Sequence, residues 1–120
     1  MCDLHLQIID CHIHIRGTMS SIANMIDVMR ACNLSGMNVL SVASQGGENT
    51  TQNVVGLLSK ALYPGQMYAF GALQYSLPGD HQNHPGFAEQ ARRLMQMGAD
   101  GMKMGEGKPS LGNRHKGHRS

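Results

Sequence analysis

Strand-like and helix-like segments alternate along this chain with a period of about thirty residues. The ends of the strand-like segments fall near His14, Ala43, Leu73 and Met104, which are 29, 30 and 31 positions apart. An amphipathic helical pattern fills each interval, and a crossover of this length joins parallel strands. We therefore expect an α/β fold, a parallel βα repeat of four strands and three helices. Both a doubly wound sheet and a partial (β/α)8 TIM barrel have this order of elements.

The repeat predicts where each element begins and ends. Strands are expected over residues 6–15, 37–43, 67–73 and 101–104. Helices are expected from Ser20 or Ser21, acting as the N-cap, to a stop at Gly36, and then over 54–62 and 85–97. The polar stretch 45–51 and the longer stretch 74–84 are expected to be loops.

Composition indicates one soluble globular domain with a short tail. The chain has 120 residues, of which 41% are hydrophobic and 15% are charged, and a formal net charge of +2. So small a charge implies neither a nucleic-acid nor a membrane partner. Residues 1–110 are expected to form the folded part, and the polar, basic residues 111–120 are expected to be a disordered tail.

Cysteine usage and the absence of targeting signals indicate a cytoplasmic protein. The three cysteines have neither disulfide-framework nor zinc-ribbon spacing. The first residues lack the pattern of a secretory signal, and no apolar run approaches the roughly 20 residues that span a bilayer.

Two histidines, His12 and His14, end the first expected strand. Alternate residues of a strand share a face, so both imidazoles would project the same way, while Cys11 and Ile13 would be buried under a helix on the other face. Two imidazoles at the carboxyl end of a parallel strand can bind one divalent metal, and zinc would require further nitrogen or oxygen ligands. The alternative interpretation is that both are polar residues at the frayed end of a strand.

Three further residues could contribute to a site beside this pair. Asp10 would lie one step deeper on the same face, where its carboxylate could orient a ligand histidine from the second shell. His81 and His84, in the expected loop 74–84, would lie at the same mouth of the sheet and could contact metal or substrate. The alternative for both histidines is an ordinary turn, because Pro and Gly residues flank them.

The run from Ile9 to His14 resembles the opening strand of the amidohydrolase superfamily, the metal-dependent hydrolases built on a TIM barrel. The segment 98–109 resembles the fourth-strand region of the amidohydrolase-related branch. The resemblance implies that His12 and His14 bind a divalent metal, commonly zinc. It also implies that Lys103 or Glu106 bridges or completes the metal site. The implied activity is hydrolysis of a C–N or C–O bond in a small-molecule substrate, or decarboxylation in some members.

The family takes further histidines from its fifth and sixth strands and an aspartate from its eighth, whereas this chain reaches only the fourth. A truncated, N-terminal half-barrel is therefore expected, with the catalytic residues unassigned. Its open sheet edges imply a homodimer or a complementary half-barrel partner. Two other functions stay open: a non-catalytic βα fragment or metal-binding module, and a TatD-like nuclease or histidinol-phosphatase-like phosphoesterase.

Overall fold

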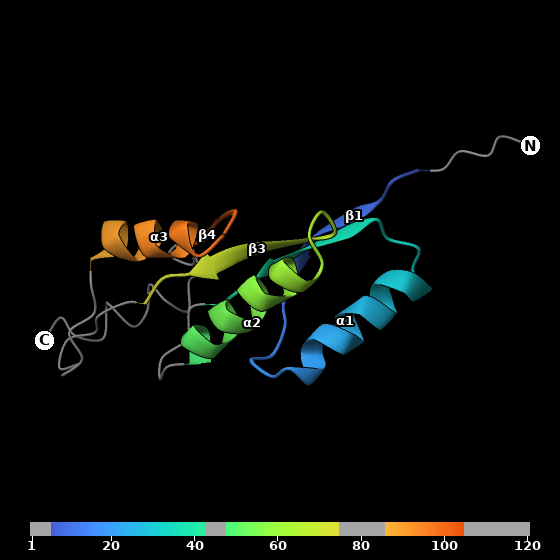
Figure 1. Cartoon of the computed structure of the whole chain (residues 1–120), viewed down its shortest axis with the longest axis horizontal. Coiled ribbons are helices and arrows are strands. Elements are labelled where there is room, and N and C mark those ends of the chain that lie inside the picture. Colours follow the sequence, from blue (N-terminus) through green and yellow to red (C-terminus); the bar gives the residue numbers. More distant parts are fainter. Residues whose placement is uncertain (1–5, 43–47, 75–85, 105–120) are drawn as a thin grey trace, which may run out of the picture.

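A computed structural model describes residues 6–42, 48–74 and 86–104 of the chain (Figure 1). In chain order its elements are β1 (Ile9–Ile13), α1 (Ser20–Ala31), β2 (Gly36–Leu40), α2 (Glu48–Leu62), β3 (Met67–Ala72), α3 (Phe87–Gln96) and β4 (Gly101–Lys103). The strands form one sheet in the order β1-β2-β3-β4, and all neighbouring pairs are parallel. The predicted α/β repeat of four strands and three helices is confirmed. The expected tail, residues 111–120, lies outside the described residues.

The sequential strand order is informative because most crossovers between parallel strands are right-handed. Repeated right-handed crossovers that step in one direction place their helices on one face of a sheet. A doubly wound sheet reverses direction at a switch point, and no reversal occurs among these four strands. The order is therefore compatible with a continuous part of a barrel.

Several element boundaries differ from those expected. Helix α2 begins at Glu48, inside the stretch 45–51 that we expected to be a loop, because a polar first turn carries no apolar periodicity. Helix α1 has Met19 as its N-cap and no side-chain cap, so the prediction of a serine cap is wrong. Ser20 and Ser21 lie inside the first turn, and their hydroxyls contact Thr18 Oγ1 at 3.2 and 2.9 Å.

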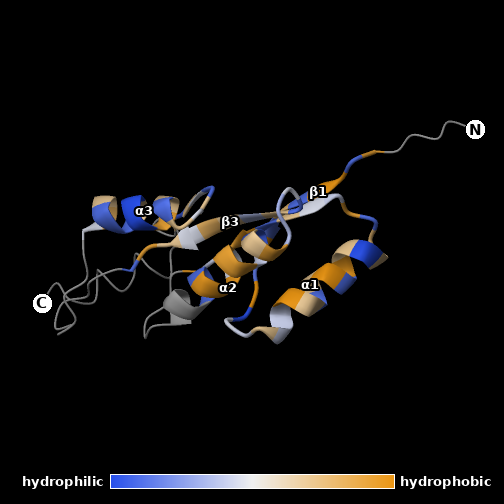
Figure 2. Ribbon diagram, in the orientation of Figure 1, coloured by the Kyte–Doolittle hydropathy of each residue, from blue (hydrophilic) through white to orange (hydrophobic). Residues whose placement is uncertain are grey.

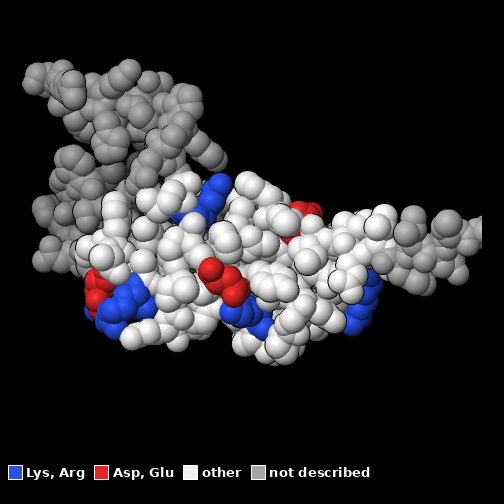
Figure 3. Space-filling model, turned by 90° about the horizontal axis from the view of Figure 1, so that it is seen from above, with Lys and Arg blue, Asp and Glu red and all other residues white. Residues whose placement is uncertain are grey.

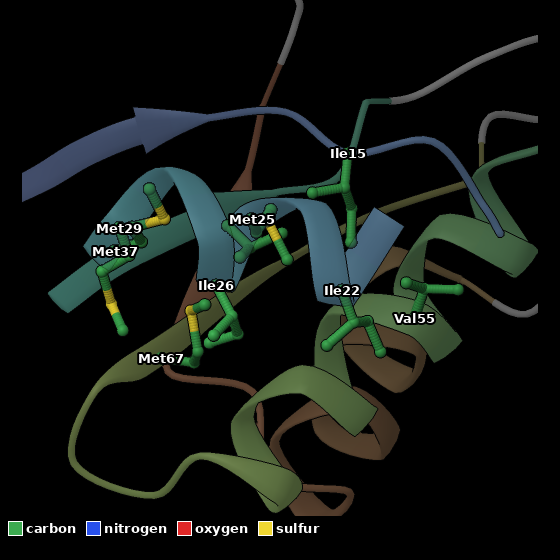
Figure 4. Packing of buried hydrophobic residues seen from close by; sticks show 9 residues of the cluster. Ile15, Ile22, Met25, Ile26, Met29, Met37, Val55 and Met67 are labelled. Atoms are coloured by element: carbon green, nitrogen blue, oxygen red, sulfur yellow. The ribbon is translucent and has the colours of Figure 1, made fainter. Parts of the chain in front are cut away.

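The main core lies between the sheet and the helices α1 and α2, which run along the same face of it (Figures 1 and 4). Its buried members are Ile15, Ile22, Met25, Ile26, Met29, Met37, Val39, Val55 and Met67. Four of these nine are methionines, whose flexible thioethers fill a core built without tryptophan. Apolar residues are concentrated along α1 and α2, whereas α3 is mostly hydrophilic (Figure 2).

A smaller core attaches α3 to the sheet. Leu94 of α3 packs with Leu73 and Ala99, and Leu57 of α2 is packed against the same cluster. Gly71 of β3 is required here, because a Cβ at that position would lie 2.9 Å from a methyl carbon of Leu94. Helix α3 therefore continues the layer that α1 and α2 begin.

Strand β1 is the least covered part of the sheet. Its register with β2 pairs Asp10 with Met37 and Ile13 with Val39, so β1 contains one extra residue between them. Ile9 is 45% exposed and Cys11 is also exposed, so the prediction that Cys11 is buried under a helix is wrong. The reason is that β1 is an edge strand whose alternation is interrupted by this bulge.

None of the helices in the described ranges combines the length and the apolar character needed to cross a bilayer.

Candidate metal centre

His12 and His14 converge at the carboxyl end of β1, as the sequence predicts. Their Nε2 atoms lie 3.1 Å apart, and the two rings meet edge to face with centroids 4.9 Å apart. Both side chains are exposed at the open side of the strand. The pair therefore presents two nitrogen atoms to one point in space.

The second nitrogen of His14 is held by the neighbouring strand. His14 Nδ1 lies 2.8 Å from the carbonyl oxygen of Leu40, which can only accept, so Nδ1 carries the proton and donates it. In the neutral ring this leaves a lone pair on Nε2, which accepts a hydrogen bond from His12 Nε2. A carbonyl that fixes the tautomer of a histidine in this way is the usual outer contact of a metal ligand.

The distance between the two nitrogens suits a shared ion. Two nitrogens bound at about 2.0–2.1 Å with tetrahedral angles are about 3.3 Å apart, and the observed separation is 3.1 Å. His12 would need to move its proton from Nε2 to Nδ1, a tautomer change that requires no movement of the main chain. The residues present therefore fit two ligands of a divalent metal.

Asp10 acts on the main chain of His12. Its Oδ1 accepts a hydrogen bond from the His12 amide at 3.0 Å, across the bulge in β1. Bulges next to binding sites change the direction of a side chain, and this carboxylate holds the bulged residue in place. The contact is with the backbone rather than the imidazole, and orientation of a metal ligand by Asp10 stays a prediction.

Asn38 of β2 is a residue that the sequence reasoning missed. Its Nδ2 donates to the carbonyl oxygen of Cys11 at 3.3 Å, which ties β2 to the bulge. Its Oδ1 is buried and has no hydrogen-bond partner among the described residues. The available signal was a single amide inside an otherwise apolar strand, because such a residue needs a specific partner.

Of the remaining predicted ligands, the structure describes only Lys103, and it does not bring Lys103 to the histidine pair. Lys103 lies in β4, three strand positions from β1, and strands spaced at about 4.8 Å separate them by roughly 14 Å. Glu106, His81 and His84 lie outside the described residues. Within the parts that the structure describes, no group of three His, Cys, Asp or Glu residues could hold a metal ion.

A separate ion pair lies at the amino end of β4. Lys60 Nζ donates to Asp100 Oδ1 at 2.8 Å and to the Gly98 carbonyl at 2.6 Å, and Asp100 Oδ2 accepts from the Ala69 amide at 3.0 Å. Partial burial raises the pKa of Asp100, but the Lys60 and Ala69 hydrogen bonds outweigh it, so the pKa is lowered overall. This cluster joins α2 to β3 and β4 and has a structural role, because it is remote from the carboxyl ends of the strands.

On the face seen in Figure 3, acidic and basic side chains form small clusters, and in several places red and blue atoms lie side by side. Comparisons with family models, with curated proteins and with solved structures found no match to this chain.

Proposed function

We propose that the chain is the N-terminal part of a metal-dependent hydrolase of the amidohydrolase type, with His12 and His14 as ligands of a divalent ion, commonly zinc. The observation that carries the proposal is the convergence of two Nε2 atoms at 3.1 Å, with His14 anchored through Nδ1 to Leu40. The sequential order of parallel strands supports the barrel, since sites in such folds lie at the carboxyl ends of strands.

The chain's own residues would prepare the site before any substrate arrives. Leu40 holds His14 in the tautomer that leaves Nε2 free to bind, and Asp10 holds the bulged backbone of His12. A divalent ion bound there supplies Lewis acidity, polarising a carbonyl and lowering the pKa of bound water, which suits hydrolysis of C–N or C–O bonds. Further ligands are needed; the sequence offers Glu106 and Lys103, of which Lys103 lies roughly 14 Å from the pair across its own sheet.

A non-catalytic metal-binding module is the second candidate. It is favoured by the incomplete ligand set, because two imidazoles without a third donor in the described ranges bind a metal weakly and position no general acid or base.

Zinc titration by calorimetry tests the ligand assignment. We expect each of the variants His12→Ala and His14→Ala to lower zinc affinity by at least about tenfold, because each removes half of the pair. His5→Ala is the matched control, since it removes a histidine outside the pair, and its affinity should be unchanged. Equal zinc affinity in the unmodified chain and in the doubly substituted variant would contradict the proposal.

Turnover of simple amides, esters and lactones separates the two candidate functions. The hydrolase proposal expects zinc-dependent turnover that His12→Ala and His14→Ala abolish. Zinc binding that depends on both histidines, without turnover of any of these substrates, would instead identify the metal-binding module.

A further inference from the structure

The face of the sheet opposite α1 and α2 is here called the inner face, and its exposure is greatest away from the carboxyl ends of β2 and β3, where Leu40 and Ala72 are buried. Tyr68 of β3, beside Asn38 of β2, is 36% exposed there. At the edge formed by β1 and the residues before it, Leu6, Ile8 and Ile9 are 67%, 50% and 45% exposed. Exposed apolar residues along a sheet edge mark a surface that pairs with another chain.

Each edge of the sheet lacks a further strand among the described residues. Among the described strands, β1 has a neighbour only on its β2 side and β4 only on its β3 side. All four strands are parallel and follow one another in order. A strand that extends the sheet beyond β4 must therefore be parallel to β4 and must begin a further series of strands, as β1 does. A second copy of the chain offers such a strand. Two copies related by a two-fold axis contribute eight strands, the number at which a parallel sheet closes with side chains filling its interior.

The register shows which residues would meet at the new edges. Lys103 pairs with Ala72. Counting two residues onward from the pair Phe70 and Leu40 sets Ala72 level with position 42. Counting three onward from the pair Val39 and Ile13 sets position 42 level with position 16.

Barrel closure shifts this register. In an eight-stranded barrel with a shear of about eight, the register moves by about eight residues around the whole barrel. Each four-stranded half therefore contributes a shift of about four residues. Without the shift, Lys103 would be level with position 16 of the second copy. A shift of four residues in one direction sets it level with His12, and a shift in the other direction sets it level with Ser20. Ser20 belongs to α1, so only His12 lies in a strand.

Charge supports the same contact. Lys103 is partly buried in β4 and has no acidic partner among the described residues, and Asp10 has no basic one within the same ranges. Pairing of β4 with β1 of a second copy would bring a cation to the edge that carries Asp10 and the histidine pair. The complementarity is reciprocal, as a two-fold interface requires.

We propose that two copies of this chain close an eight-stranded barrel, with β4 of each copy beside β1 of the other and Lys103 beside the partner's His12. The inference rests on the barrel fold of the proposed function but not on its chemistry. Each histidine pair then lies in a closed mouth shared with the second copy, which supplies the lysine that the chain's own sheet holds about 14 Å away.

The molar mass of the unmodified chain, measured by light scattering after size exclusion, is the first test. The dimer has about twice the 13.0 kDa of the chain. A mass of 13.0 kDa at every concentration tested would overturn the proposal.

Disulfide trapping tests the register. The background is the chain with its three native cysteines changed to serine, and the trapping variant adds His12→Cys and Lys103→Cys. Neighbouring strands bring Cα atoms within the roughly 4.4–6.8 Å that a disulfide spans, so oxidation should give a dimer that reductant separates. The control, Val28→Cys with Lys103→Cys, places one thiol on the exposed side of α1 and should stay monomeric on a denaturing gel. Equal crosslinking in both variants would contradict the register.

Neither the molar mass nor the disulfide crosslink requires bound metal or turnover, so this proposal and the hydrolase proposal can fail separately.

Discussion

At the scale of single residues, the histidine pair shows what the alternation of side chains along a strand can predict. The spacing of His12 and His14 predicted that both rings lie on one face, and their Nε2 atoms do meet at 3.1 Å. The carbonyl of Leu40, 26 positions away, selects the tautomer of His14. That contact was not predictable from the sequence, because a backbone carbonyl has no signature of its own.

Asp100 is the residue whose titration should affect stability. Because its pKa is lowered on folding, its contribution is present above the pKa of the unfolded chain, about 3.9, and is lost as pH falls through the folded value. We expect Asp100→Asn to lower the free energy of unfolding by about 1 kcal/mol at pH 7. The difference from the unmodified chain should shrink below about pH 4.

Urea denaturation between pH 3 and pH 7 measures this effect. Asp27→Asn, which changes an exposed carboxyl group of α1, is the control and should remain within about 0.5 kcal/mol of the unmodified chain. A difference for Asp100→Asn that is independent of pH would show that its carboxylate does not contribute through its charge.

At the scale of elements, amide side chains from the helices bind the ends of the strands. Asn53 of α2 accepts from the Ala72 amide at 2.8 Å and donates to the Ala72 carbonyl at 3.0 Å. Gln90 of α3 makes the same pair of bonds with Gln74, at 2.7 and 3.0 Å. These amides replace missing strand neighbours where the strands end, and they fix where the following loops leave the sheet.

Removing the amide of Asn53 should therefore loosen the end of β3. We expect Asn53→Ala to lower the free energy of unfolding by about 2 kcal/mol, because it leaves the partly buried amide and carbonyl of Ala72 without partners. Hydrogen exchange at the Ala72 amide should accelerate as well. Asn24→Ala, on the exposed side of α1, is the matched control, and an equal loss of stability in both variants would contradict this role.

At the scale of the whole molecule, the two faces of the sheet are unequal. The face toward α1 and α2 holds the main core, whereas the inner face includes the exposed Tyr68 and Asn38 Oδ1, which has no hydrogen-bond partner in the described part of the chain. Helix packing thus stabilises one side, and the other side is the one that carries the candidate site.

Two methionines of opposite burial test where stability resides. Met37 is 2% exposed within the main core, whereas Met97 is 61% exposed after α3. We expect Met37→Ala to lower the free energy of unfolding by about 2–4 kcal/mol, through lost burial and the cavity left behind. Met97→Ala should change it by less than about 0.5 kcal/mol. Chemical denaturation measures both, and similar losses would show that the core between sheet and helices is not the source of stability.

The sequence by itself determined the class of fold and the pairing of the two histidines. The periodicity of side chains depends only on the local geometry of helices and strands. The thirty-residue repeat and the alternation in β1 can therefore be recognised in a single sequence. Boundaries were predictable only where apolar residues reach the end of an element, which is why the polar start of α2 at Glu48 was missed.

The tertiary structure decided what depends on contacts between distant segments. These are the bulge beside Asp10, the carbonyl that orients His14, the exposure of Cys11 and the unpartnered oxygen of Asn38. Each arises from how β1 lies against β2, and the register between two strands is a property of the packed sheet rather than of either strand. The order of the strands, with β2 and β3 between β1 and β4, places Lys103 far from the histidines of its own chain, which is the physical reason for inferring a second copy.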